Sequence, residues 1–310
     1  RGARVRVGEG TEAGHEFYSD RRIPGRPRGA DRSGRRALAD RGCLMSVQLL
    51  GILNVTPDSF SDGGLYAEQS AAVERGIAMR DEGATLVDVG GESTRPGAER
   101  IDPEEEQRRV IPVVRELVAA GVSVSVDTMN AETALAAAGA GASVINDVSG
   151  GLADPGMYRA VAETGLTYIA MHWRGHSTDM DALATYDDVV IDVREELKAR
   201  LSEMIVSGVD LRRVILDPGL GFAKRHEHNW QLLGRLDELA SLGHPLLVGA
   251  SRKRFLSPWG AEPAERDEAT AIVSALAANA GVWGVRVHDV VSTRAALEIT
   301  EAWQNGRTDS

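Results

Sequence analysis

The sequence predicts an α/β fold in which eight parallel strands alternate with helices and close into a (β/α)8 barrel, also called a TIM barrel. Two observations predict it. Short apolar, β-branched runs alternate with longer segments of helical periodicity over most of the 310 residues. Polar and charged residues follow almost every strand-like run, where parallel sheets place ligand-binding groups. We therefore expect a single barrel domain over residues 45–310.

Eight segments have the length and composition of strands that are buried on both faces of a parallel sheet. They are residues 49–54, 85–90, 122–127, 143–148, 166–171, 214–217, 245–249 and 283–288. A doubly wound open sheet would use the same alternation, but its Gly-x-Gly-x-x-Gly fingerprint does not follow the first strand. The alternation of eight strands with eight helices therefore favours the barrel.

Helical periodicity fills the intervals between these runs and continues after the last one. The clearest segments are residues 70–82, 103–120, 131–139, 186–207, 230–242, 267–280 and 292–303. Asp102 before Pro103 is typical of a helix N-cap that is followed by a first-turn proline. Gly121 and Gly208 stand where helices commonly end in a left-handed residue. These signals set the expected helix boundaries.

Residues 1–44 differ in composition from the rest of the chain. They contain eleven arginines and six acidic residues, a charge of +5 in a chain whose total is −11. They lack the apolar core of a secretory signal, and their acidic residues argue against a transit peptide. Because they contain many Gly and Pro residues and almost no periodic apolar pattern, we expect a disordered Arg/Gly-rich extension.

The acidic balance of the chain excludes some classes of partner. With a formal net charge of −11, the protein is not expected to bind nucleic acid or an anionic membrane. No run of about 18 uninterrupted apolar residues is present to span a bilayer. The single cysteine, Cys43, excludes an internal disulfide and a cysteine-based metal cage. We therefore expect a cytoplasmic protein whose substrates are small molecules.

The predicted strand ends concentrate charged and amide side chains. In chain order the strand-end residues are Asn54, Asp88, Glu92, Thr94, Arg95, Asp127, Asn146, Asp147, Met171, His172, Asp217, Ser251, Arg252, Lys253, Arg286 and His288. In a barrel the carboxyl ends of all strands meet at one rim, where such barrels build their active sites. Any one of these residues suits an ordinary turn, whereas their joint appearance predicts a binding site.

The rim residues include two chemical sets. The first set consists of Asp127, Asn146, Asp217 and Lys253. Its carboxylates and amide accept hydrogen bonds from N–H groups and its ammonium meets a carbonyl oxygen or ring nitrogen, which suits a flat nitrogen heterocycle. The second set consists of Asn54, Thr94, Arg95, Arg286 and His288. Its donors suit phosphate or diphosphate, and the amide oxygen of Asn54 can bind a divalent metal.

Seven stretches around these residues are long and specific. They are ILNVTPDSFSDGG (52–64), DVGGESTRPGAE (88–99), VSVDT (124–128), INDVSGG (145–151), LDPGLGFAK (216–224), VGASRKRFL (248–256) and VRVHDV (285–290). They closely resemble the dihydropteroate synthases, pterin-binding enzymes of folate biosynthesis. The resemblance implies a transferase with Mg²⁺ as its cofactor. Its substrates would be a 7,8-dihydropterin that carries a methylene diphosphate and 4-aminobenzoate, and diphosphate would leave.

The resemblance also implies roles for single residues. Asn54 resembles the residue associated with Mg²⁺, Thr94 a ligand of the diphosphate, and Arg95 part of a mobile loop that orders over the site. Asp127, Asn146, Asp217 and Lys253 resemble the residues that hold the pterin, Arg286 and His288 those that hold the leaving diphosphate, and Phe222 and Ser251 stand near aminobenzoate. The implied catalytic residues are Asp127, Arg95 and Lys253.

The resemblance further implies a homodimer through the helices that flank strand eight, where residues 271–281 are small and apolar.

The implied reaction suggests a mechanism. An electron-rich dihydropterin allows the carbon–oxygen bond to break first, and the aromatic amine then attacks the delocalised cation. Asp127 is our choice for stabilising the cation, and Mg²⁺, Arg286 and His288 for neutralising the diphosphate. Two other functions stay open at this point. One is a pterin-dependent methyltransferase, which would not need the anion-binding set, and the other is a pterin-binding paralogue without catalytic activity.

Some rim residues have simpler interpretations. We expect Asp88 to be the structural partner of a loop amide and Met171 to line the core. His172, His176, His226, His228 and His244 are expected to be surface or loop histidines, because none has a metal-ligand spacing such as His-Glu-x-x-His.

Overall fold

The structure of the protein is a computed structural model, which describes residues 47–56, 64–92, 101–175 and 182–308. Ser46–Ser310 form one compact unit. The extension predicted for residues 1–44 lies outside the described residues, and so do Thr94, Arg95 and His176.

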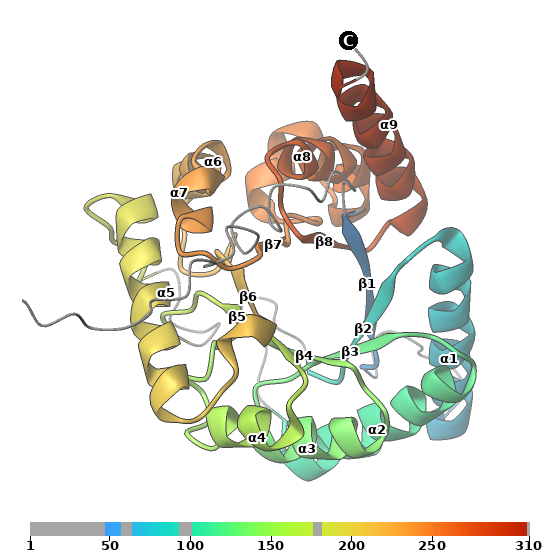
Figure 1. Ribbon diagram of the computed structural model, residues 1–310. Coiled ribbons are helices and arrows are strands. Elements are labelled where there is room, and N and C mark those ends of the chain that lie inside the picture. The colour runs from blue at the N-terminus through green and yellow to red at the C-terminus, as the bar shows by residue number, and fades with distance from the viewer. Residues whose placement is uncertain (1–46, 57–63, 93–100, 176–181, 309–310) are drawn as a thin grey trace, which may run out of the picture. The chain divides into compact units, whose positions relative to one another are not determined.

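Eight parallel strands form one sheet in the described residues, as the sequence predicts (Figure 1). They are β1 Gln48–Asn54, β2 Leu86–Gly90, β3 Val124–Asp127, β4 Val144–Asp147, β5 Thr167–Met171, β6 Val214–Asp217, β7 Leu247–Val248 and β8 Gly284–Val287. Neighbouring strands follow the order β6-β5-β4-β3-β2-β1-β8-β7. The two ends of this series meet where Leu216 N donates to Pro245 O at 2.9 Å, beside a parallel bridge between Leu216 and Leu246. The sheet is therefore a nearly closed barrel.

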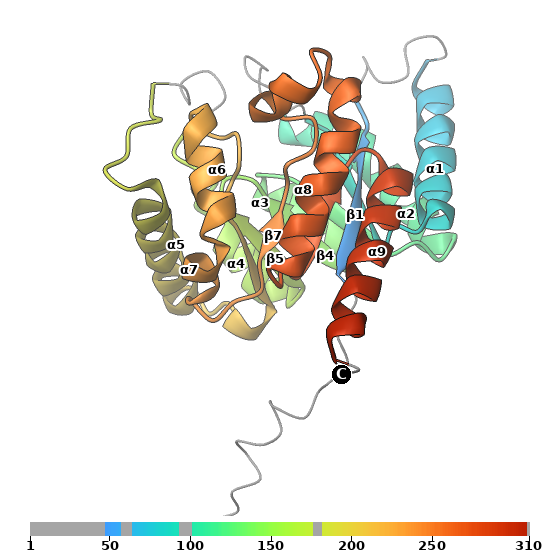
Figure 2. The same ribbon diagram turned by 90° about the horizontal axis from the view of Figure 1, so that it is seen from above.

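Helices follow the strands and form an outer ring around the barrel (Figures 1 and 2). They are α1 Gly64–Glu82, α2 Pro103–Ala119, α3 Ala131–Gly139, α4 Met157–Thr164, α5 Val189–Val206, α6 His226–Gly234, α7 Leu236–Ala240, α8 Asp267–Asn279 and α9 Val290–Thr308, with short 3-10 helices η3 Leu211–Arg213, η4 Arg254–Trp259 and η5 Pro263–Arg266. The last two α-helices lie side by side, α8 against β8 and α9 against β1. In the described part of the chain, no helix is both long enough and apolar enough to cross a membrane.

The predicted boundary signals of α2 and α5 are confirmed. Asp102 Oδ1 accepts a hydrogen bond from Glu104 N at 2.8 Å, so Asp102 caps α2. Gly121 and Gly208, just beyond the ends of α2 and α5, adopt φ angles of 75° and 83°. Both helices therefore stop where the sequence indicates.

The continuous helix predicted over residues 230–242 is wrong. Residues in this range belong to two helices, α6 and α7, which are separated at Arg235, where φ is −135° and ψ is 40°. Gly234 ends α6, and glycine is a poor helix former. Arg235 donates to Asp188 and Glu238 from this bent position. The interactions of Arg235 with α5 and α7 therefore favour a break over a continuous helix.

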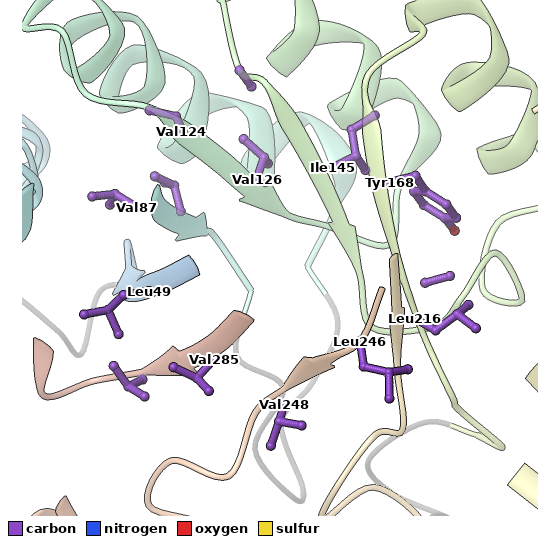
Figure 3. Packing of buried hydrophobic residues seen from close by; sticks show 14 of the residues in the cluster. Leu49, Val87, Val124, Val126, Ile145, Tyr168, Leu216, Leu246, Val248 and Val285 are labelled. Atoms are coloured by element: carbon purple, nitrogen blue, oxygen red, sulfur yellow. The ribbon is translucent and has the colours of Figure 1, made fainter. Parts of the chain in front are cut away.

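The strand side chains alternate between the helices and the barrel interior. Figure 3 labels ten outward side chains around the strands: Leu49, Val87, Val124, Val126, Ile145, Tyr168, Leu216, Leu246, Val248 and Val285. A separate apolar layer fills the interior: Leu50, Leu86, Val144, Ile169, Ile215 and Leu247. Two residues further along β2, β4 and β6, the inward positions are Asp88, Asn146 and Asp217. The interior therefore changes from apolar to polar toward the carboxyl ends of the strands.

The loop after β6 depends on a glycine at its start. Gly219 has a φ of 67°, and a Cβ atom added there would lie 2.2 Å from His172 O. Gly208 has a φ of 83°, but a Cβ atom there would meet nothing within 4 Å. The two glycines therefore share a left-handed backbone but differ in the space around them.

We expect Gly219→Ala to destabilise the protein more than Gly208→Ala. A left-handed alanine costs roughly 1–2 kcal/mol, which is the whole expected effect at Gly208. At Gly219 the backbone of His172, just after β5, must also move away from the new methyl group, which adds about 1–3 kcal/mol. Urea denaturation of the two variants measures the difference. Equal free energies of unfolding would show that the close approach to His172 does not constrain the loop.

Candidate active site

The guanidinium group of Arg286 joins strands inside the barrel. Its Nε donates to Asp88 Oδ2 at 2.5 Å, and its Nη2 donates to Asp127 Oδ2 at 2.6 Å. The side-chain amide of Asn146 also donates to Asp88 Oδ2, at 2.9 Å. Strands β2, β3, β4 and β8 are therefore linked through one buried polar cluster.

This cluster perturbs the pKa values of its members. Burial by itself would lower the pKa of Arg286, but the carboxylates of Asp88 and Asp127 raise it above its usual value. Burial raises the pKa of Asp127 to about 7, although the charge of Arg286 opposes the shift. Arg286 thus stays charged, whereas ionised Asp127 is held in an unfavourable environment.

Asp88 is the member of the cluster whose partners were not predicted. It is fully buried, and both partners of its Oδ2 are side chains on strands, not a loop amide as expected. Its Oδ1 is buried and has no hydrogen-bond partner among the described residues. Asp88 orients Asn146, because the amide must turn its nitrogen toward the carboxylate and its oxygen away.

Asp217 and Lys253 border a second part of the rim. Asp217 Oδ1 accepts a hydrogen bond from Gly219 N at 2.7 Å, which leaves Oδ2 as the outer oxygen. A Cβ atom added to Gly249 would lie 3.7 Å from Asp217 Oδ2 and 3.9 Å from Lys253 Nζ. The space in front of Gly249 is therefore bordered by a carboxylate and an ammonium group.

Burial also shifts the pKa values of this pair. It raises the pKa of Asp217 and lowers that of Lys253 to about 8, and each charge opposes the shift of the other. The ammonium of Lys253 donates to Leu220 O and lies 4.8 Å from the centre of the Phe222 ring. Lys253 thus connects η4, whose first residue follows it, with the loop after β6.

Ser251 and His288 form a third group. Ser251 Oγ lies 2.9 Å from His288 Nδ1 and accepts a hydrogen bond from His288 N at 3.1 Å. Asn54 ends β1, the strand beside β8, and its backbone pairs with Gly90. The structure therefore brings Asp127, Asn146 and Arg286 together, Asp217 with Lys253 and Phe222, and Ser251 with His288.

Two residues near the rim have environments that bear on the predictions. Met171 is buried in a small apolar cluster with Met129 and Val148, against which Phe222 packs, and this confirms it as core lining. His172 was expected to be a surface or loop histidine; it lies in the segment just after β5, but it is only 2% exposed, so a surface position is wrong. Its ring is enclosed because it lies between Lys224 and Glu196, 2.9 Å from each. Lys224 had stood out only as the last residue of the LDPGLGFAK stretch.

The chain is similar to known proteins over most of its length. Residues 50–288 match the family of pterin binding enzymes. The dihydropteroate synthase of Mycobacterium leprae (strain TN) is 52% identical over 268 residues, which cover 84% of this chain and 94% of the relative. A structure of Xanthomonas albilineans dihydropteroate synthase with 4-aminobenzoic acid has a TM-score of 0.79 at 44% identity, over 84% of this chain and 94% of that one. A second structure of that enzyme, in complex with 7,8-dihydropteroate, has a TM-score of 0.76 at 41% identity, over 84% of this chain and 95% of that one. The chain therefore belongs to the pterin-binding enzyme family.

Proposed function

We propose that the rim binds the two substrates of the dihydropteroate synthase reaction and joins them. The protein is a transferase of folate biosynthesis, which condenses (7,8-dihydropterin-6-yl)methyl diphosphate with 4-aminobenzoate to give 7,8-dihydropteroate and diphosphate. The observation that carries the assignment of the site is the opposed carboxylate and ammonium of Asp217 and Lys253 in front of Gly249. A pterin edge carries N–H donors beside a carbonyl oxygen, so it requires both kinds of partner at one place.

The pterin lies, in this proposal, between Asp217, Lys253, Asn146 and Asp127. Asp217 Oδ2 accepts from the pterin N–H groups, and Lys253 donates to the carbonyl oxygen or a ring nitrogen. Asn146 adds its amide oxygen, since its nitrogen is engaged with Asp88. The burial of these groups supports the proposal, because charge-assisted hydrogen bonds are strong where water is excluded.

The chemical step needs opposite charges at two places. The bond between the methylene carbon and the diphosphate oxygen breaks with its electron pair on the diphosphate, and a cation forms that is delocalised over the pterin. The amine nitrogen of aminobenzoate then donates its lone pair to this carbon and loses a proton. Ionised Asp127 stabilises the cation, and Arg286 and His288 neutralise the diphosphate. The Thr94 hydroxyl is proposed to donate a hydrogen bond to the diphosphate, and Arg95 to belong to a loop that orders over the site.

Mg²⁺ is proposed as the cofactor, and the residues of the rim fit a metal that arrives with the diphosphate. The described residues contain no group of three or more His, Cys, Asp or Glu side chains that could hold a metal ion. Asn54 offers one amide oxygen, and Mg²⁺ is often held by few protein ligands together with substrate phosphates and water. When bound, Mg²⁺ neutralises charge on the diphosphate. Asn54 would be its protein ligand.

Phe222 and Ser251 are proposed to border the aminobenzoate site. Ser251 shares its hydrogen bonds with His288, so the aminobenzoate and diphosphate sites would adjoin. Phe222 packs against the apolar cluster that contains Met171 and lies under Lys253, which supports an aromatic ring binding next to the pterin. A pterin-dependent methyltransferase is not favoured, because the comparisons match dihydropteroate synthases and because it would not need Arg286 and His288 as an anion site.

We also propose that the protein is a homodimer. Helices α8 and α9 lie side by side and expose Ile272, Leu276, Ile299 and Trp303, each between 56% and 70%. Neighbouring apolar side chains with this exposure on two adjacent helices support an interface between copies of the chain.

The cytoplasm stays the proposed location, because the single cysteine cannot form an internal disulfide. Cell fractionation would test the location, and recovery in the membrane fraction would contradict it.

We expect the purified protein to make dihydropteroate from dihydropterin diphosphate, 4-aminobenzoate and Mg²⁺, with one diphosphate released for each product. Mass spectrometry detects the product. Removal of Mg²⁺ by a chelator should stop turnover, and added Mg²⁺ should restore it. Failure to form product with both substrates and metal present would contradict the proposed function.

Asp217→Asn should weaken the binding of a dihydropterin that lacks the diphosphate. The variant keeps the shape of the side chain but loses a charge-assisted hydrogen bond worth roughly 1.5–3 kcal/mol, which corresponds to about 10- to 150-fold in Kd. Isothermal titration calorimetry measures it. Asp210→Asn, at a partly exposed carboxylate that pairs with Arg212, is the matched control and should bind normally. Unchanged affinity in Asp217→Asn would remove Asp217 from the pterin site.

Leu276→Asp should convert the proposed dimer to a monomer, because it places a charge on the exposed apolar side of α8. Ile205→Asp is the control, since Ile205 is exposed to a similar degree, 61%, but lies on α5. Light scattering after size-exclusion chromatography gives both masses. A monomeric mass for the unaltered protein, or an unchanged dimer in Leu276→Asp, would contradict this interface.

A further inference from the structure

Lys224 is a buried lysine outside the proposed substrate contacts. It lies in the loop between β6 and α6 and is only 6% exposed. Its Nζ donates to Phe222 O at 3.0 Å and lies 2.9 Å from His172 Nδ1. Lys224 thus links the carbonyl group of an aromatic residue of the rim to the end of β5.

The partners of His172 determine which of its ring nitrogens donates a hydrogen bond and which accepts one. His172 Nε2 lies 2.9 Å from Glu196 Oε2, and a carboxylate can only accept there. Burial lowers the pKa of His172 to about 4, so the neutral ring carries its proton on Nε2 and accepts from Lys224 at Nδ1. Glu196 is held in turn by Arg174, which donates to it and lies over the Tyr186 ring, 3.8 Å from its centre.

The number of hydrogen-bond acceptors around the Lys224 amine is sufficient for its neutral form. Phe222 O and His172 Nδ1 provide two acceptors, which match the two N–H groups of a neutral amine. Burial lowers the pKa of Lys224 to about 7; Asp217 opposes this shift, whereas Lys253 and Arg174 reinforce it. Lys224 can therefore hold the loop in either protonation state.

Other restraints on this loop act on the residues around Phe222. Tyr186 Oη donates to Ala223 O at 2.9 Å, and Asn229 Oδ1 accepts from Gly221 N at 2.6 Å. Ala223 has a φ of 47°, a left-handed conformation that costs an alanine energy and persists only where neighbours hold it. Lys224 instead donates to the carbonyl group of Phe222 itself.

We propose that Lys224 is a positioning residue, which fixes the backbone of Phe222 so that its ring stays beside Lys253 and the apolar cluster of Met171 and completes the aminobenzoate site. The chain from Arg174 through Glu196 and His172 orients the lysine amine. This inference rests on the proposed function, in which Phe222 borders aminobenzoate. Loss of the amine should weaken aminobenzoate binding more than pterin binding, because Asp217, Asn146 and Asp127 are held by other partners.

The position of the Phe222 ring can be measured without turnover. The protein has four phenylalanines, so 4-fluorophenylalanine labelling gives a simple fluorine NMR spectrum, in which Phe222→Leu identifies the Phe222 signal. Lys224→Met keeps the length and burial of the side chain but removes its donors. We expect the Phe222 signal to shift or broaden in Lys224→Met and to stay unchanged in Lys198→Met, the control at a side chain that is 64% exposed.

Steady-state kinetics provides the second readout. Lys224→Met should raise the KM for 4-aminobenzoate about tenfold, the scale of one lost buried hydrogen bond, and change the KM for dihydropterin diphosphate less than about twofold. A residue with only a structural role would lower the melting temperature and affect both substrates alike. Equal changes in the two KM values would therefore overturn the proposal.

A second variant covers the case in which Lys224→Met does not fold. Glu196→Ala changes a side chain that is 40% exposed and frees the His172 tautomer, so it should move the Phe222 signal in the same direction, but less. An unmoved Phe222 signal in a folded Lys224→Met protein, or in Glu196→Ala if the first variant is unfolded, would overturn the proposal. Absence of product from the unaltered protein would instead contradict the proposed function and leave the NMR result interpretable.

Discussion

The Arg286 guanidinium group is the interaction on which the arrangement of the rim depends. Asp88 and Asp127 both project into the barrel above an apolar layer, where two carboxylates without a cation would repel each other and lose their hydration. Arg286 contacts both, at 2.5 and 2.6 Å, and the planar guanidinium fixes the direction of each contact. Asn146 then takes its orientation from Asp88. One hydrogen-bonded cluster, centred on Arg286 and Asp88, thus links four strands.

The same burial has an energetic consequence for the chemistry. A pKa of about 7 for Asp127, against its ordinary 3.8, means that ionising it near neutral pH costs up to roughly 4 kcal/mol more than in water. A cation about 4 Å away stabilises a carboxylate by a similar amount, roughly 4 kcal/mol at an effective dielectric constant of about 20. In the proposed mechanism, a pterin cation that forms beside Asp127 would therefore offset a cost of this size.

The sequence was sufficient for features that follow from short-range patterns. The apolar runs predicted all eight strands, and the polar residues that end them predicted that Asp127, Asn146 and Asp217 share one rim, because strand ends of a barrel meet there. The sequence was insufficient where the local structure depends on residues that are far away along the chain. The environment of His172 depends on Glu196 and Lys224, which are 24 and 52 residues away, and the break at Arg235 depends on Asp188. The roles of Thr94 and Arg95 stay predictions.

Gly249 is a position where the stability of the folded protein and the space for a ligand favour different residues. Its φ is not in the left-handed region, and an added Cβ atom would touch Asp217 Oδ2 and Lys253 Nζ only at ordinary van der Waals distances of 3.7 and 3.9 Å. The backbone alone would accept alanine, which also restricts the unfolded chain more than glycine does. Stability by itself therefore favours a methyl group there, whereas the flat pterin of the proposed function, which approaches the strand closely, disfavours it. The Cβ atom of an alanine at position 249 would therefore make the protein more stable and, at the same time, exclude ligands that lie flat against the strand.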